Sequence, residues 1–236
     1  MTRTRKTLIG CGSLVGLFLV IGIGAAIATP SAKPKPGAST ATTPTNTPAA
    51  TNPTSTPQKV ATRVVTGKLV TLGAGTFTGG TDVADGLYNV TAGAGQSGNF
   101  IVSGTDSYDE IFGESAAYGG VPEVRAQISS GDQIQISGLS SVNFTPVTTP
   151  FVTTYTTTNL YAGTFTVGQD IGAGRYVGTP GAGQSGNFIV TGTDSYDEIL
   201  GGSSADGGVP NVTVTLTKGD IIDISSLSQV TLTPTS

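Results

Sequence analysis

Residues Val124 to Ile136 read VRAQISSGDQIQI, and residues Val212 to Ile224 read VTVTLTKGDIIDI. In both stretches apolar and polar residues alternate on either side of a central Gly-Asp pair. An alternation with a period of two residues is typical of a half-buried β-strand, and glycine followed by aspartate is common in turns. Each stretch therefore predicts two strands that are joined by a turn.

The two stretches are separated by 88 positions, and the same offset relates the whole C-terminal part of the chain to itself. Residues 59–146 realign with residues 147–234 without a gap. The segment Gly93–Ile111 matches its repeat at 18 of 19 positions, compared with 46 of 74 over residues 73–146. Self-similarity of this kind indicates repeated structural units. We therefore predict two modules, 59–146 and 147–236, each long enough for a small domain.

Other short apolar runs complete the pattern of strands within each module. They lie at Thr76–Thr78, Leu87–Thr91, Asn99–Ser103 and Val142–Phe144, and no segment has the pattern of a long amphipathic helix. Of the 35 glycines, 29 follow residue 58, where many turns are needed. Six or seven strands per module predict an all-β fold of two tandem antiparallel β-sandwich or jelly-roll-like domains.

The junction between the two modules is rich in threonine but also carries apolar residues. Val147 to Thr158 reads VTTPFVTTYTTT, and Val152 corresponds to Val64 in the 88-residue register. A free linker does not need these apolar residues. We expect this stretch to be the opening strand of the second module, which would hold the two modules close together.

The N-terminal part of the chain predicts a membrane anchor followed by a linker. Residues 8–28 are 21 consecutive uncharged residues, enough to cross the bilayer as a helix, and basic residues in 1–7 favour a cytoplasmic N-terminus. The alternative is a secretory signal that is cleaved after Ala28, which would release a secreted protein. Residues 29–58 contain seven prolines and no aromatic residue, and they predict a disordered Pro/Thr-rich linker.

The charge and the composition of the repeats exclude several function classes. All 15 acidic residues but only six of the 11 basic residues follow residue 58, so the repeats would be repelled by nucleic acid. The chain has no histidine, and its one cysteine, Cys11, lies in the apolar leader. Imidazole and thiolate chemistry, including metal sites built from these groups, are therefore absent from the repeats, and we predict neither an enzyme nor a cofactor.

A glycine motif in each module resembles a nucleotide-binding fingerprint. Gly93 to Gly98 and Gly181 to Gly186 have the spacing G-x-G-x-x-G, which binds a pyrophosphate when a helix follows it. Here the strand-forming residues Asn99 to Val102 follow. We therefore interpret the motif as a hairpin loop.

The densest group of acidic residues is the candidate ligand-binding site in each module. It contains three carboxylates and one tyrosine per copy: Asp106, Tyr108, Asp109 and Glu110, and then Asp194, Tyr196, Asp197 and Glu198. Three carboxylates on one loop are a possible calcium site, although the spacing matches no EF-hand loop. A glycan that contacts the tyrosine face and the carboxylates is a second alternative, and a solvated acidic turn is the third.

Residues Gly168 to Tyr176, GQDIGAGRY, resemble the VGxDIxAGxY opening of small extracytoplasmic repeats in uncharacterised surface proteins and lipoproteins of Gram-positive bacteria. The resemblance continues through the loop Gly181 to Phe188 and through Leu216 to Ile224, and so it covers the second module. The first module keeps Asp82, Gly86 and Tyr88 of the same motif. The resemblance implies no known activity or catalytic residues, and it implies a module that follows a membrane or lipid anchor and a low-complexity linker.

Together these features predict a single-pass protein of the cell membrane with its repeats outside the cell. The expected function is non-catalytic binding or adhesion to a surface glycan or a protein, because two linked copies of a weak site gain avidity. The alternative is a purely structural envelope or stalk protein without a ligand. The sequence leaves the oligomeric state open.

Overall fold

The computed structural model describes residues 61–113 and 115–235. The predicted N-terminal region 1–7, membrane segment 8–28 and linker 29–58 lie outside the described residues. Within the described ranges, the structure contains no helix that is long and apolar enough to span a membrane. The described residues belong to one compact unit, and the two repeats contact each other within it.

Short β-strands make up both repeats, and one brief 3-10 helix interrupts each of them. The described part of the first repeat contains β1 (Val70–Leu72), β2 (Gly75–Thr78), β3 (Gly86–Ala92), β4 (Gly98–Ser103), β5 (Tyr108–Phe112), η1 (Ala116–Tyr118), β6 (Gly120–Val121), β7 (Glu123–Ile128), β8 (Gln133–Ser137) and β9 (Val142–Pro146). The second contains β10 (Thr158–Leu160), β11 (Gly163–Thr166), β12 (Gly174–Pro180), β13 (Ser185–Thr191), β14 (Tyr196–Gly201), η2 (Ser204–Asp206), β15 (Val212–Leu216), β16 (Ile221–Ser225) and β17 (Val230–Pro234). The strands confirm the all-β prediction.

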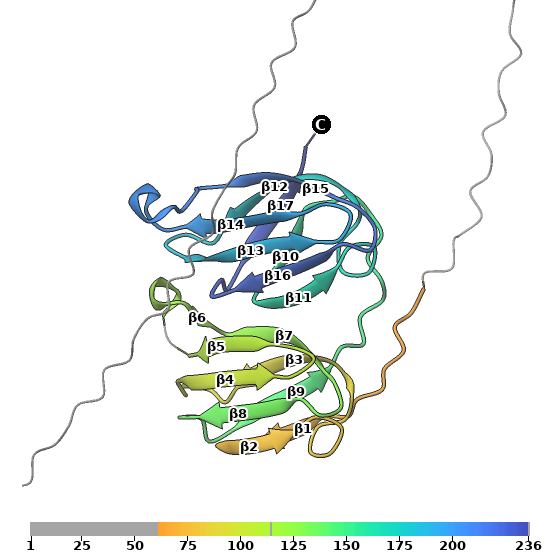
Figure 1. The fold of residues 1–236 in the computed structure, drawn as a ribbon, viewed down its shortest axis with the longest axis vertical. Coiled ribbons are helices and arrows are strands. Elements are labelled where there is room, and N and C mark those ends of the chain that lie inside the picture. Colours follow the sequence, from red (N-terminus) through yellow and green to blue (C-terminus); the bar gives the residue numbers. More distant parts are fainter. Residues whose placement is uncertain (1–60, 114, 236) are drawn as a thin grey trace, which may run out of the picture. The chain divides into compact units, whose positions relative to one another are not determined.

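The order of the strands in the sheets is repeated as well (Figure 1). In the first repeat the orders are β1-β9-β3-β7 and β2-β8-β4-β5-β6, and in the second they are β10-β17-β12-β15 and β11-β16-β13-β14. Most neighbouring strands are antiparallel. An exception is the pair β7 and β11, which is parallel and joins Arg125 to Gly163. Through this pair the sheet β1-β9-β3-β7 continues into β11-β16-β13-β14 as one sheet of eight strands.

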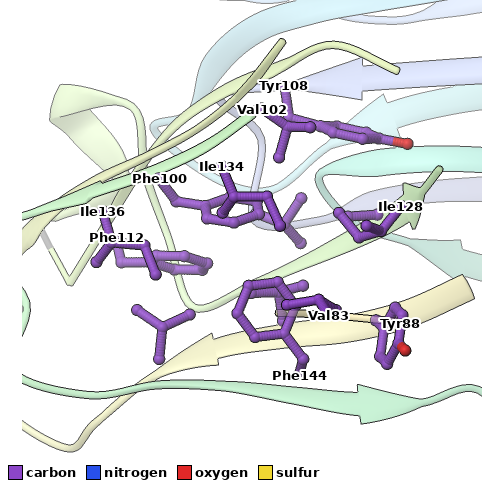
Figure 2. Close-up of a cluster of buried hydrophobic side chains, with 14 of the residues drawn as sticks. Val83, Tyr88, Phe100, Val102, Tyr108, Phe112, Ile128, Ile134, Ile136 and Phe144 are labelled. Carbon is purple, nitrogen blue, oxygen red and sulfur yellow. The ribbon is translucent and has the colours of Figure 1, made fainter. Parts of the chain in front are cut away.

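Each repeat has its own hydrophobic core, to which both of its sheets contribute. In the first repeat Phe100 of β4 and Ile134 of β8 point toward Phe144 of β9, and Phe112 and Tyr88 extend the same cluster (Figure 2). The rings of Phe100 and Phe144 pack edge to face with their centroids 5.9 Å apart. The second repeat has a cluster in the corresponding place. These cores arise because the alternating strands bury every second side chain.

The prediction that the junction forms the opening strand of the second module is wrong. Residues 147–157 form no strand, and β10 begins only at Thr158. The backbone N–H of Phe151 donates to the carbonyl of Ala61, whereas that of Val152 donates to the carbonyl of Gln169. Because neighbouring residues bond to different segments, no ladder forms. The predicted closeness of the two repeats is nevertheless confirmed by these and other contacts.

The glycine motif is followed by a strand, as predicted, but it is not a hairpin loop. It joins β3 of one sheet to β4 of the other, and these two strands are not hydrogen-bonded neighbours. The Gln96 side chain holds this crossing loop, since its carbonyl accepts the backbone N–H of Ser140 and of Ser141 at 2.6 and 3.1 Å. Gln184 in the second repeat accepts from the N–H of Gln229 at 3.2 Å.

Candidate functional site

The structure separates the residues of the predicted acidic site rather than placing them on one loop. Asp106 precedes β5, whereas Tyr108, Asp109 and Glu110 belong to the strand itself. Successive side chains of a strand point to opposite faces, so Tyr108 and Glu110 are buried while Asp109 is exposed. In the second repeat Tyr196, Asp197 and Glu198 lie on β14 in the same way, and Asp194 precedes that strand.

Asp106 and Asp194 support the fold locally. The carboxylate of Asp106 accepts the hydroxyl of Ser129 at 2.7 Å, and that of Asp194 accepts the hydroxyl of Thr217 at 2.7 Å. Burial raises the pKa of Asp106, and the hydrogen bond from Ser129 opposes this rise. Both carboxylates therefore tie the turn before β5 or β14 to a neighbouring turn.

The aspartate of the Gly-Asp pair organises this region, although the sequence indicated only a turn at this position. Asp132 is fully buried, and one of its oxygens accepts the backbone N–H of Thr105 at 2.7 Å while the other accepts that of Ser129 at 2.8 Å. Asp220 makes the equivalent bonds to Thr193 and Thr217, both at 2.7 Å. The sequence signal was its presence in both copies, directly before an alternating strand.

Tyr108 contacts the second repeat through its hydroxyl group. This hydroxyl donates to the hydroxyl oxygen of Thr164 on β11 at 3.2 Å and accepts the backbone N–H of Gln127 at 2.9 Å. Burial raises the pKa of Tyr108. Its phenol is therefore a neutral bridge between the two repeats.

Glu110 also contacts the second repeat. Its two carboxylate oxygens accept the backbone N–H of Ser226 at 3.0 and 3.2 Å, and the residue is 3% exposed. Burial raises the pKa of Glu110 to about 7, against the opposing effect of the Ser226 hydrogen bond. A small cavity of about 190 Å³ lies beside Tyr108 and Glu110 at this contact.

A buried group of three charged residues adds to the contact, and sequence reasoning missed it. Arg63 and Arg125 both donate to one carboxylate oxygen of Asp170, while its other oxygen accepts the backbone N–H of Thr166 at 2.8 Å. The three side chains are only 5 to 8% exposed. The guanidinium carbon of Arg125 also lies over the ring of Phe165, 5.2 Å from its centroid, within the roughly 6 Å of a cation–π contact. One sequence signal could have indicated this group. Its two arginines are not repeated, because Phe151 and Thr213 stand at the corresponding positions of the second repeat.

The same sequence therefore lies in two different environments. Tyr108 and Glu110 are buried against the second repeat, whereas Tyr196 and Glu198 are only half-buried. Thr213 and Thr215 of β15 are exposed, whereas their counterparts Arg125 and Gln127 are buried and half-buried, respectively. The candidate site of the first repeat is an internal interface, and the equivalent surface of the second repeat is open.

The described residues provide no metal centre. Within residues 61–113 and 115–235 there is no group of three or more acidic or other metal-binding side chains that could hold an ion. The calcium alternative therefore has no geometry to support it. The open surface of β14 and β15 presents a tyrosine, carboxylates and an unpaired strand edge. These groups suit the binding of a polypeptide, which can add a strand to an exposed sheet edge.

Comparisons of this chain with protein-family models, with curated proteins and with solved structures found no match.

Proposed function

We propose that this chain is a membrane-anchored protein of the cell surface that binds a partner without catalysis. Its two modules, 59–146 and 147–236, are tandem antiparallel β-sandwiches that the leader 8–28 anchors and the linker 29–58 holds away from the membrane. The repeated sheet orders and the separate cores of the two repeats support the tandem arrangement. The apolar leader and the proline-rich segment support the anchor and the spacer.

One observation carries the binding role. The surface around Tyr108 and Glu110 is buried against another β-module within the chain, and the surface around Tyr196 and Glu198 has the same sequence but is open. A surface that already packs against a protein in one copy has the shape and the hydrogen-bonding groups to do so in the other. A protein partner is therefore favoured over a glycan, and the binding site is the face formed by β14 and β15.

The purely structural alternative is favoured by a different observation. The Arg63, Arg125 and Asp170 group and the β7–β11 pair hold the two repeats together, which suits a stiff spacer. A spacer needs no open binding face, so substitutions of Tyr196 would then have no effect on any interaction.

The binding role is tested with the full chain displayed on cells. The wild type and Tyr196→Ala would be compared for capture of cell-surface proteins and of immobilised surface glycans, with Asp206→Ala as a matched exposed control. Loss of capture only in Tyr196→Ala supports the role. Equal capture by all three chains would leave the structural alternative.

Treatment of intact cells with protease should remove the repeats, and their protection would overturn the cell-surface location.

A further inference from the structure

The contact between the two repeats pairs the edge strand of one sheet with the edge strand of another. Each repeat contains a counterpart of both of these edge strands. β7 ends one sheet of the first repeat, β11 ends one sheet of the second, and the two strands pair with each other. In the 88-residue register β15 corresponds to β7, and β2 corresponds to β11. Among the described strands, β15 and β2 each end a sheet without a further neighbour. The chain therefore carries an unpaired copy of each edge.

Burial confirms that these two edges are uncovered. Ala162 and Gly163 are buried beneath the first repeat, but their counterparts Ala74 and Gly75 are exposed. The fit at the internal contact is close, since a β-carbon on Gly163 would lie 2.1 Å from the carbonyl oxygen of Arg125. On the other edge, Thr213 is exposed where Arg125 is buried.

We propose that the β14 and β15 face of one molecule binds the β2 edge of a second molecule of the same chain, so that copies associate head to tail. This inference rests on the proposed function and names its partner as another copy of this chain. A contact between two different surfaces of identical molecules can add further copies in the same direction.

The groups that make the internal contact are kept at the two free surfaces. Tyr196 and Thr76 carry the hydroxyls that correspond to Tyr108 and Thr164. The backbone N–H of Arg125 donates to the carbonyl of Ala162 at 2.8 Å, and a parallel β15–β2 pair would repeat this bond between Thr213 and Ala74. Backbone bonds of this kind do not depend on the side chain that each strand carries.

The acceptor and the donor of the glutamate hydrogen bond are also kept. Glu198 corresponds to Glu110, and Gly138 corresponds to Ser226. Ser226 has a φ of 61° and Gly138 a φ of 76°, so both backbones are left-handed at this point. Ser226 is unusual, because no other residue except glycine has a positive φ in the part of the chain that the structure describes. The backbone N–H of Gly138 is therefore presented in the same local conformation.

Neither free edge carries the usual protection against pairing. β2 reads GTFT and β15 reads VTVTL, without a charged residue or a proline. Exposed edge strands of natural proteins are commonly blocked by lysine, proline or a bulge, which prevents pairing with another chain. The absence of lysine and proline from β2 and β15 agrees with edges that pair with a second molecule.

The charged group is the part of the internal contact that is not repeated. Asp82 corresponds to Asp170 and accepts the backbone N–H of Thr78 at 2.8 Å, as Asp170 accepts that of Thr166. Its two arginine partners are replaced by Phe151 and Thr213. The contact between molecules is therefore weaker than the internal one, and anchoring in a membrane raises the local concentration that it needs.

Cross-linking tests the predicted register with the full chain in detergent micelles. Two single-cysteine chains, both carrying Cys11→Ser, would be mixed: one with Thr213→Cys and one with Ala74→Cys. A short bis-maleimide should link them. The control replaces the second chain with Thr145→Cys, an exposed position on β9, which is paired on both sides. The proposal would be overturned if the Thr213→Cys chain were linked equally well to the Thr145→Cys and Ala74→Cys chains. It would also be overturned if the Thr213→Cys chain were linked to neither.

A designed gain of affinity provides a second test. Thr213→Arg places an arginine opposite Asp82, as Arg125 lies opposite Asp170. It should lower the concentration for half-maximal association roughly tenfold, as a charge-assisted bond of moderate strength would. Adding Asp82→Asn should reverse the gain, whereas adding Asp206→Asn should not. Sedimentation velocity measures each midpoint, and an unchanged midpoint for Thr213→Arg contradicts the proposed register.

The two proposals fail in different ways. A chain that stays monomeric and shows no specific cross-link, but whose capture of another surface protein is lost in Tyr196→Ala, would overturn head-to-tail association and leave the binding role. A chain that neither self-associates nor captures any partner through Tyr196 would overturn both.

Discussion

The carboxylate of Glu110 accepts the backbone N–H of Ser226 at 3.0 and 3.2 Å, although 116 positions separate the two residues. This bond crosses from the first repeat to the second, and Glu110 itself is only 3% exposed. A carboxylate loses its hydration when it is buried, and one N–H group does not replace it fully. The same residue therefore holds the two repeats together and makes their contact sensitive to pH.

Glu110→Gln should remove much of this sensitivity. The pKa of Glu110 is raised from 4.5 to about 7, so protonation favours the folded contact. Its favourable contribution is complete below about pH 4.5 and is lost as the pH rises through about 7. The variant keeps a carbonyl acceptor for Ser226 without the charge, and at pH 8 it should be more stable by about 1 to 3 kcal/mol. Urea unfolding of the full chain at pH 5 and pH 8, followed by circular dichroism, measures the difference.

Glu198→Gln is the matched control, because Glu198 has the same neighbours in the sequence but is only half-buried. It should change the pH dependence much less than Glu110→Gln does. Equal effects of the two substitutions would show that burial at the contact between the repeats is not the cause.

Asp170→Asn should strongly destabilise the contact between the repeats. It removes the negative charge between Arg63 and Arg125 and leaves both guanidinium groups buried. Breaking a buried ion pair by removing one partner typically costs about 3 to 5 kcal/mol. Asp82→Asn keeps a carbonyl acceptor for the backbone N–H of Thr78 and leaves no buried guanidinium group behind, so it should cost at most about 1 kcal/mol. Urea unfolding compares the two, and similar losses would contradict the importance of the buried charges.

Part of the fold follows from the sequence because the strands alternate regularly. β8 has the residues QIQIS with the two isoleucines buried, so its pattern alone predicts a strand. β5 has the residues YDEIF, and there Glu110 occupies a buried position between Tyr108 and Phe112. A glutamate inside a strand hides the alternation, and for this reason the segment was predicted to be an acidic loop.

The site itself could be predicted only in part, because it depends on the contact between the repeats. The sequence identity of Gly93–Ile111 and its repeat indicated a shared surface, but not that one copy of that surface is covered. The partners of Glu110 and Tyr108 are Ser226 and Thr164, which are far away in the sequence and carry no motif. A pattern with a period of two residues reports which face of a strand is buried and not which module buries it.

Asp132→Asn and Asp220→Asn should destabilise their own repeats by similar amounts. Each aspartate is fully buried and accepts backbone N–H groups with both carboxylate oxygens. An amide nitrogen in place of one oxygen would face an N–H donor, and a buried unsatisfied donor costs about 1 to 3 kcal/mol. Thermal unfolding should show a comparable loss for each variant. A loss confined to one of them would contradict an equivalent role in the two repeats.

Tyr108→Phe and Tyr196→Phe should separate a structural tyrosine from a binding tyrosine. Removal of the Tyr108 hydroxyl deprives the backbone N–H of Gln127 of its acceptor and Thr164 of its donor, at a cost of about 1 to 3 kcal/mol in urea unfolding. Tyr196→Phe should change the stability by less than about 0.5 kcal/mol, because Tyr196 is half-buried. Its effect should appear instead as weaker association between molecules in sedimentation velocity. If Tyr196→Phe lowered the stability as much as Tyr108→Phe, the β14 face would be part of the fold and not an open binding surface.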